Sequence, residues 1–118
     1  MKILIVDDSP LIRKRLKDFL EDQDYDVFEA DNGLDAVKLY NQHKPDVAFM
    51  DILMPKLDGL TAMAQILNEH PKAKIIILSS MGQQSKIIEA IQSGATDFIV
   101  KPFEPGKVIA AIEKAYAI

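Results

Sequence analysis

Reactive side chains follow four of the apolar, strand-like runs in this sequence. They are Asp7 and Asp8 after residues 3–6, Asp51 after 47–50, Ser79 and Ser80 after 75–78, and Lys101 after 98–100. If the strands form a parallel sheet, their carboxyl ends lie at one edge, where open α/β folds bind ligands. Any one of these residues, taken alone, is best explained as a polar residue where a strand reaches the surface. The four positions together indicate a site.

The three aspartates would form an acidic cluster that needs a cation. Two carboxylates about 4 Å apart repel each other by roughly 4 kcal/mol at an effective dielectric constant of 20. Lys101 could supply one positive charge, and a metal ion could supply two. Since the cluster contains no His or Cys, its oxygen ligands favour a hard ion such as Mg²⁺, which usually binds one or two carboxylates together with a phosphate.

This set of residues indicates phosphate chemistry. A carboxylate such as Asp51 can attack phosphorus and form an aspartyl phosphate. Lys101 would then neutralise phosphoryl oxygens, and the Ser79 hydroxyl would donate a hydrogen bond to another. The sequence has no GxxxxGK[ST] segment, so we do not expect a P-loop to hold the phosphate donor.

Composition limits the function further. A chain of 118 residues that is 48% hydrophobic is long enough for one core and too short for two, so we expect a single domain over residues 1–118. The net charge of −4, without a basic block, argues against direct binding to nucleic acid or to an anionic membrane. There is no cysteine, and no apolar run is long enough for membrane insertion. A soluble cytoplasmic protein is expected.

The sequence alternates between strand-like and helical patterns. Strands are expected at residues 3–6, 26–30, 47–50, 75–78 and 98–100, with helical periodicity between them. This alternation predicts βαβ units and a mostly parallel sheet, hence the α/β class. Residues 47–50 are apolar throughout, as in a strand that is buried on both faces.

Capping residues predict where the helices begin and end. The expected starts are Ser9-Pro10, Asn32-Gly33, Asp58-Gly59, about Gln83, and Pro105. The fourth helix is expected to end near Ser93, with Gly94 in a left-handed conformation. Ile87, Ile88 and Ile91 are interpreted as mostly core because of their helical spacing, and composition alone also favours a core position for Phe98.

These residues, in their order and spacing, resemble the response-regulator receiver family. The segments that carry the resemblance are Ile5-Val6-Asp7-Asp8-Ser9, Met50-Asp51-Ile52-Leu53-Met54-Pro55 with Asp58-Gly59, Ser79-Ser80, Gly94-Ala95 and Lys101-Pro102-Phe103. Ser80-Met81-Gly82-Gln83-Gln84 is similar in particular to stand-alone chemotaxis regulators of the CheY type. The resemblance implies a doubly wound (βα)5 flavodoxin-like sandwich with a five-stranded parallel sheet of order 2-1-3-4-5. It also implies that residues 1–118 form a single receiver domain.

The resemblance assigns a role to each residue of the site. Asp51 matches the phosphoacceptor, Asp8 a direct Mg²⁺ ligand, Asp7 a ligand through water, and the backbone carbonyl of Leu53 a further ligand. Ser79 and Phe98 match the switch pair, and Lys101 matches the phosphate-binding lysine. Leu53 and Met81 match the two positions that flank the path of the attacking water. The family has a cis Lys101–Pro102 bond, although sequence alone favours trans.

The implied function is two-component signal transduction. A histidine kinase would transfer a phosphoryl group to Asp51 in a Mg²⁺-dependent reaction. The surface of the fourth helix, fifth strand and fifth helix would then bind an output protein, such as a flagellar motor component, and a phosphatase is a further expected partner. The protein would be a signalling switch rather than an enzyme, although it would assist its own phosphotransfer and slow self-dephosphorylation.

Two alternatives remain open from the sequence. The first is a small Mg²⁺-dependent aspartyl-phosphate phosphatase or phosphotransferase. Haloacid dehalogenase-type phosphatases carry a second Asp two residues after the nucleophile, whereas Leu53 stands there in this chain. The second is a receiver domain excised from a larger regulator with an output domain.

Overall fold

The computed structural model describes residues 1–102 and 104–117 of the chain. Phe103, the last residue of the Lys101-Pro102-Phe103 segment, lies outside the described residues. Within the described part, five strands alternate with five helices. The strands are β1 (Lys2–Val6), β2 (Asp26–Ala30), β3 (Val47–Asp51), β4 (Ile75–Ser79) and β5 (Asp97–Val100). The helices are α1 (Pro10–Asp22), α2 (Gly33–His43), α3 (Gly59–Glu69), α4 (Gln84–Gln92) and α5 (Pro105–Tyr116).

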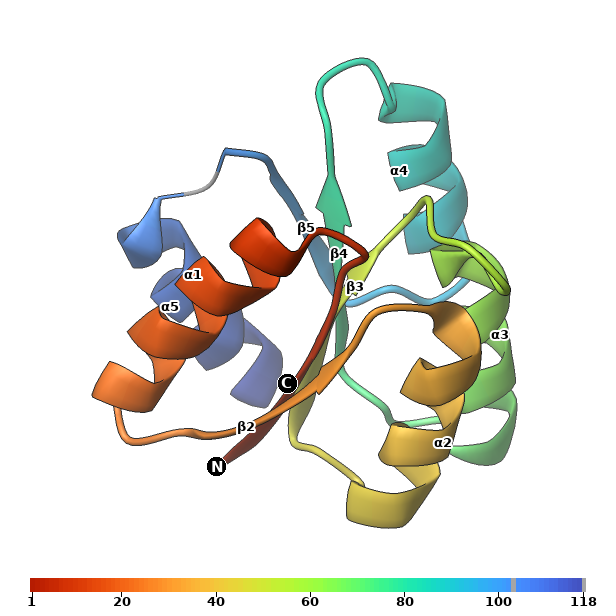
Figure 1. The fold of residues 1–118 in the computed structure, drawn as a ribbon. Helices are drawn as coiled ribbons and strands as arrows, with labels where there is room; N and C mark the ends of the chain where they lie inside the picture. Colours follow the sequence, from red (N-terminus) through yellow and green to blue (C-terminus); the bar gives the residue numbers. More distant parts are fainter. Residues whose placement is uncertain (103, 118) are drawn as a thin grey trace.

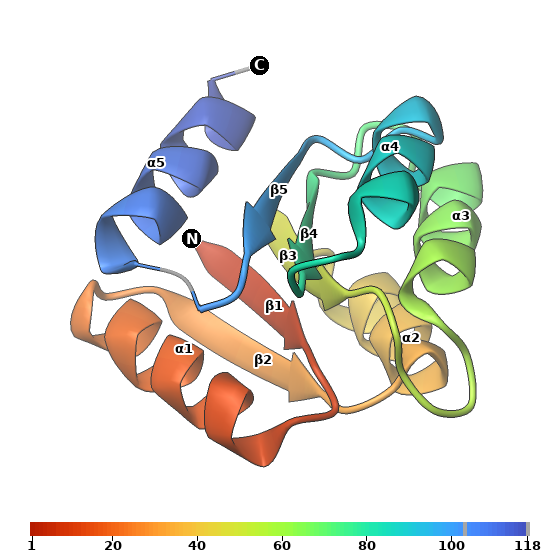
Figure 2. The same ribbon diagram turned by 90° about the horizontal axis from the view of Figure 1, so that it is seen from above.

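The strands form one parallel sheet in the order β2-β1-β3-β4-β5. Helices α1 and α5 cover one face of the sheet, and α2, α3 and α4 cover the other (Figures 1 and 2). Every residue of the central strands β3 and β4 is buried, as expected for parallel strands covered on both faces. The predicted doubly wound architecture and strand order are confirmed.

Each helix face that meets the sheet forms part of an apolar core. One core joins the sheet to α2, α3 and α4, and the other joins it to α1 and α5. Leu16 and Leu20 are the buried residues of α1, and they pack in the second core. Because both faces of the sheet are covered, the polar ends of the strands are left as the places where functional side chains can gather.

The predicted starts of α1, α2 and α3 each have a side-chain cap, whereas those of α4 and α5 have no side-chain cap hydrogen bond. The Ser9 hydroxyl accepts a hydrogen bond from the Ile12 N–H, the Asn32 side chain from Asp35, and the Asp58 carboxylate from Thr61. Such caps satisfy backbone donors that the first helical turn leaves unpaired. Helix α4 is shorter than expected by one residue at each end, and Gly94, with a φ of +114°, follows it as predicted.

The core interpretation of three side chains is wrong. The exposed fractions are 57% for Ile88, 42% for Ile91 and 41% for Phe98. Helix α4 and the edge strand β5 line an open apolar groove, so side chains that face this groove stay in contact with solvent. Of the α4 isoleucines expected in the core, Ile87 is the one that packs partly against it.

No helix in the described part of the chain is long and apolar enough to cross a membrane.

Candidate functional site

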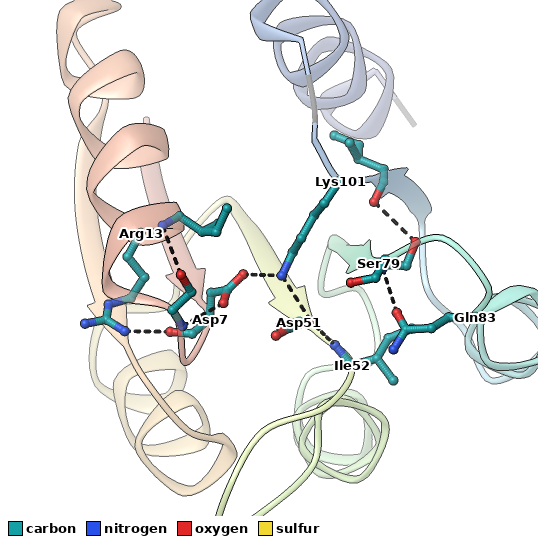
Figure 3. A network of polar contacts seen from close by, with 11 residues as sticks. Asp7, Arg13, Asp51, Ile52, Ser79, Gln83 and Lys101 are labelled. Atoms are coloured by element: carbon teal, nitrogen blue, oxygen red, sulfur yellow. Dashed lines mark hydrogen bonds and ion pairs between the residues drawn. The ribbon is translucent and has the colours of Figure 1, made fainter.

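Three aspartates and a lysine meet at the carboxyl edge of the sheet, and Figure 3 shows Asp7, Asp51 and Lys101 among them. Asp7 and Asp8 follow β1, and Asp51 ends β3. Each of the three offers a carboxylate oxygen, and these oxygens lie within 4.8 Å of one another. The ammonium of Lys101, which follows β5, lies 2.6 Å from Asp7 Oδ2 and 3.4 Å from Asp51 Oδ1. The parallel sheet therefore brings together the acids and the cation that the sequence predicted.

Asp7 is completely buried. Its Oδ1 accepts a hydrogen bond of 2.9 Å from the Ser9 N–H. Its Oδ2 makes the ion pair with Lys101 but has no partner in hydrogen-bonding geometry. The 2.6 Å separation between Lys101 Nζ and Asp7 Oδ2 is still a strong attraction, because the attraction between charges does not depend on hydrogen-bond angles. A buried carboxylate oxygen in this condition still has the capacity to bind a further cation or a water ligand of one.

Asp51 is 7% exposed, and its Oδ1 accepts a hydrogen bond of 2.9 Å from the Ile52 N–H. Burial, followed by the neighbouring charge of Asp7, raises the pKa of Asp51 from 3.8 to about 6, against the opposing effect of Lys101. Asp8 contributes a smaller increase. One lysine therefore does not fully compensate this acidic cluster, and a second cation would favour the charged carboxylate.

The turn after β3 depends on a glycine beside the acidic cluster. The Gly59 N–H donates a 2.7 Å hydrogen bond to the carbonyl of Ile52. A Cβ atom at position 59 would lie 1.9 Å from the carbonyl oxygen of Asp51. Any side chain there would displace the backbone that carries Asp51. Asp58-Gly59 therefore does more than begin α3, which was the only role that the sequence had indicated for it.

Ser79 connects the site to β5. It is buried at the end of β4, and its hydroxyl lies 3.4 Å from the carbonyl of Ile99. Its own carbonyl accepts a 2.7 Å hydrogen bond from the Lys101 N–H. The bond between Lys101 and Pro102 is cis, as the family resemblance implied. The Ser79 hydroxyl and the Lys101 ammonium thus come from neighbouring strands.

Apolar side chains stand beside the site. Leu53 is 60% exposed and Met81 is 84% exposed, in the loops that follow β3 and β4. Phe98 is on β5, in register with Ile77 of β4, and faces the groove beside α4. The roles that the sequence assigned to Leu53, through its backbone carbonyl, and to Phe98 stay predictions.

The donor set fits a hard metal ion. Three carboxylates from two neighbouring strand ends provide oxygen ligands alone, which is the coordination that Mg²⁺ prefers. Asp8 is exposed whereas Asp7 and Asp51 are buried, so one side of the cluster remains open to water and to a phosphate. We conclude that the cluster is able to hold a metal ion.

Sequence reasoning missed how two residues support the site, although it had named Gln83 as a helix start and within the family resemblance. Arg13, on α1, donates a 2.7 Å hydrogen bond from Nη1 to the carbonyl of Asp7. The Gln83 side chain accepts a 2.7 Å hydrogen bond from the Ser80 N–H, in the loop after β4 (Figure 3). Arg13 stands among four basic residues of α1, and nothing in that pattern shows which of them turns towards the sheet edge.

The fold and this cluster together define an α/β domain with an acidic, lysine-containing site suited to metal-assisted phosphate chemistry. The chain belongs to the response regulator receiver domain family, whose model matches residues 3–113. Members of this family are phosphotransfer signalling modules, and this chain is a signalling switch of that kind.

Known proteins similar to the chain include chemotaxis regulators. It is 51% identical over 116 residues to the chemotaxis protein CheY of Listeria monocytogenes, with 98% of each chain covered. The receiver domain of NtrX from Brucella abortus superimposes with a TM-score of 0.93 at 32% identity, covering 98% of both chains. A chain of the CheX-CheY-BeF3-Mg complex of Borrelia burgdorferi gives a TM-score of 0.92 at 31% identity, covering 98% of this chain and 89% of that one.

Proposed function

We propose that residues 1–118 form a single receiver domain in which Asp51 accepts a phosphoryl group from the phosphohistidine of a histidine kinase. The observation that carries this proposal is the Lys101 ammonium between Asp7 and Asp51, within a cluster of three carboxylates. A carboxylate nucleophile, a second cation and a fixed lysine are the parts that phosphoryl transfer to an aspartate requires.

In this reaction a carboxylate oxygen of Asp51 attacks phosphorus, the new O–P bond forms, and the P–N bond to the histidine breaks. The electron pair of the broken bond returns to the imidazole. Asp51 Oδ1 is held by the Ile52 N–H, so the other carboxylate oxygen is the one presented for attack. Asp8, Asp51 and the Leu53 carbonyl, with Asp7 through water, would hold a Mg²⁺ ion, which would supply positive charge to neutralise the phosphoryl group.

Lys101 and Ser79 would detect the phosphorylated state. The Lys101 ammonium binds one phosphoryl oxygen, which replaces part of its present ion pair with Asp51. The Ser79 hydroxyl is tied to the Ile99 carbonyl by a long contact of 3.4 Å, so moving it towards the phosphate breaks a weak interaction. Phe98, now exposed, would turn inward as Ser79 moves.

The output surface would be α4, β5 and α5. Exposed apolar side chains from α4 and β5 line the groove there: Ile88, Ile91, Phe98 and Val100. Burial of such side chains favours association with an apolar partner surface. By similarity to the chemotaxis relatives, the partner would be an output protein such as a flagellar motor component.

A phosphatase is a further proposed partner. The Borrelia burgdorferi structure, a complex of CheX with CheY, supports the presence of a second protein partner for a regulator of this type. The protein would not turn over substrate as an enzyme does, although it would assist its own phosphorylation and slow self-dephosphorylation. We also propose a cytoplasmic location for the protein, because the proposed phosphoryl donor is the cytoplasmic domain of a histidine kinase.

The experiment is phosphorylation by acetyl phosphate, or by a phosphorylated histidine kinase, followed by intact-mass analysis. We expect one phosphoryl group with Mg²⁺, none with EDTA, and none in Asp51→Asn. Asp18→Asn removes an exposed carboxylate of α1 and serves as the matched control, which should be labelled normally. Label that persists in Asp51→Asn would move the acceptor to Asp7 or Asp8 and overturn the proposal.

A further inference from the structure

The peptide group that joins Asp7 to Asp8 is fixed from outside the acidic cluster. Its carbonyl oxygen, which belongs to Asp7, accepts the 2.7 Å hydrogen bond from Arg13 Nη1. On the other side of the Asp7 Cα, the N–H of the preceding peptide group donates a 3.2 Å hydrogen bond to the carbonyl of Ala30 on β2. The Cα atoms of both acids lie in this peptide plane, so a hydrogen bond to its carbonyl restricts ψ of Asp7 and φ of Asp8, the backbone angles that orient the two side chains relative to each other. A contact to its carbonyl therefore acts on both acids at once.

Arg13 is itself held in place. Its Nε lies 3.5 Å from Glu29 Oε1, and its side chain is 18% exposed. The other oxygen of Glu29 lies 3.3 Å from the ammonium of Lys17. The planar guanidinium thus joins the loop after β1 to a carboxylate on β2, through two of its nitrogens. Lysine has a single ammonium on a flexible stem and cannot reproduce this fixed pair of donors.

We propose that Arg13 is a positioning residue, which orients the Asp7–Asp8 peptide so that both carboxylates are in place for Mg²⁺. This inference rests on the proposed metal site. Mg²⁺ demands nearly ideal octahedral geometry with ligands at about 2.1 Å, so a rotated peptide plane at two adjacent acids weakens its binding. Loss of groups that orient metal ligands commonly lowers metal affinity by about 10- to 100-fold.

A positioning role and a purely electrostatic role of Arg13 predict opposite changes in Mg²⁺ affinity when the residue is removed. If Arg13 acted only through its positive charge, removing it would strengthen the binding of a cation to the neighbouring carboxylates. If it acts by holding the peptide, removing it weakens binding. Ca²⁺ offers a second distinction, because it tolerates flexible and irregular coordination. Loosening the Asp7–Asp8 peptide should therefore lower the affinity for Mg²⁺ more than the affinity for Ca²⁺.

The experiment measures Mg²⁺ and Ca²⁺ dissociation constants by calorimetry for the wild type, Arg13→Lys and Arg13→Ala. Urea unfolding in EDTA identifies the variants that are folded. If Arg13→Ala fails to fold, Arg13→Lys, which keeps the positive charge, still tests the proposal. We expect at least a tenfold loss of Mg²⁺ affinity in both variants, with a smaller loss for Ca²⁺. Arg15→Ala removes an exposed arginine of the same helix and is the matched control, expected to bind both ions normally.

Glu29→Gln tests the support behind Arg13. We expect a loss of Mg²⁺ affinity of about two- to fivefold, because the guanidinium keeps its bond to Asp7 but loses its anchor. The double variant Arg13→Lys with Glu29→Gln should bind no more weakly than Arg13→Lys alone. Fully additive losses would mean that Glu29 acts independently of Arg13 and would contradict this part of the mechanism.

The positioning role is overturned if folded Arg13 variants bind Mg²⁺ as tightly as the wild type, or more tightly. Equal losses for Mg²⁺ and Ca²⁺ would also overturn it, since they would show a general disturbance rather than a loss of geometry. A wild-type protein that binds no Mg²⁺ would refute the metal site of the proposed function itself. The failure of the two proposals is therefore distinguishable.

Discussion

Neutralising Asp51 should stabilise the protein when no metal is bound. The raised pKa of Asp51, about 6 against 3.8, means that the folded state binds this proton more tightly than the unfolded state does. Between these values the folded state holds more protons, so stability falls as pH rises, and it stays lowered at higher pH. A difference of about two pKa units corresponds to roughly 3 kcal/mol.

The expected gain in Asp51→Asn is smaller than this limit. The raised pKa already includes the attraction of Lys101, but the asparagine amide brings a hydrogen-bond donor where the carboxylate had an acceptor, which offsets about 1 kcal/mol. We therefore expect the free energy of unfolding to rise by about 2 kcal/mol at pH 8 in EDTA, which corresponds to a midpoint shift of about 8 °C for a domain of this size. At pH 5 the wild-type carboxylate is mostly protonated in the folded state, and the gain should fall to about a third.

Thermal and urea unfolding of the two proteins at pH 5 and pH 8 provide the assay. Asp18→Asn, at an exposed position, is the control and should change stability by less than about 0.5 kcal/mol at either pH. Mg²⁺ at ten times its dissociation constant should stabilise the wild type by about 1.4 kcal/mol, which narrows the difference in the free energy of unfolding between the wild type and Asp51→Asn. The reasoning is refuted if Asp51→Asn is no more stable than the wild type at pH 8, or if its gain does not shrink at pH 5.

Three further predictions concern the other residues of the site. Asp8→Ala should weaken Mg²⁺ binding more than Asp7→Ala, as titration calorimetry would show, and equal losses would mean that both acids coordinate the ion directly or that neither does. Lys101→Ala should remain folded but lose about 2–4 kcal/mol of stability in EDTA, because buried carboxylates lose their cation. Lys101→Ala should also uncouple phosphorylation from partner binding. Beryllium fluoride should shift NMR signals across α4, β5 and α5 in the wild type, but only near Asp51 in the variant. Wild-type shifts confined to the site would contradict the proposed change of the output surface. Leu53 and Met81 cannot orient water by hydrogen bonding, which explains the slow self-dephosphorylation that we expect. The double variant Leu53→Asn with Met81→Glu should therefore lose its phosphoryl group several-fold faster than the wild type. An unchanged rate of dephosphorylation at unchanged Mg²⁺ affinity would disprove this explanation.

The sequence by itself determined the α/β class and the mostly parallel sheet, while the strand order was implied by the family resemblance. Fully apolar runs such as residues 47–50 predict strands covered on both faces, and caps such as Asn32 and Asp58 predict where helices begin, because these signals depend on local backbone chemistry. The gathering of Asp7, Asp8, Asp51 and Lys101 was also predictable, since parallel strands bring their carboxyl ends to one edge whatever the details of packing. The cis bond before Pro102 was available only through the family resemblance.

Only the tertiary structure decided how these parts are used. Helical spacing showed that Ile88 and Ile91 share a face of α4, but their exposure depends on how far α4 stands from the edge strand β5. The pKa of Asp51 depends on burial and on the distances to Asp7 and Lys101. The contact of Arg13 with the Asp7 carbonyl depends on the placement of α1 against β2. Burial and contacts between distant segments arise from packing in three dimensions, which local sequence patterns do not specify.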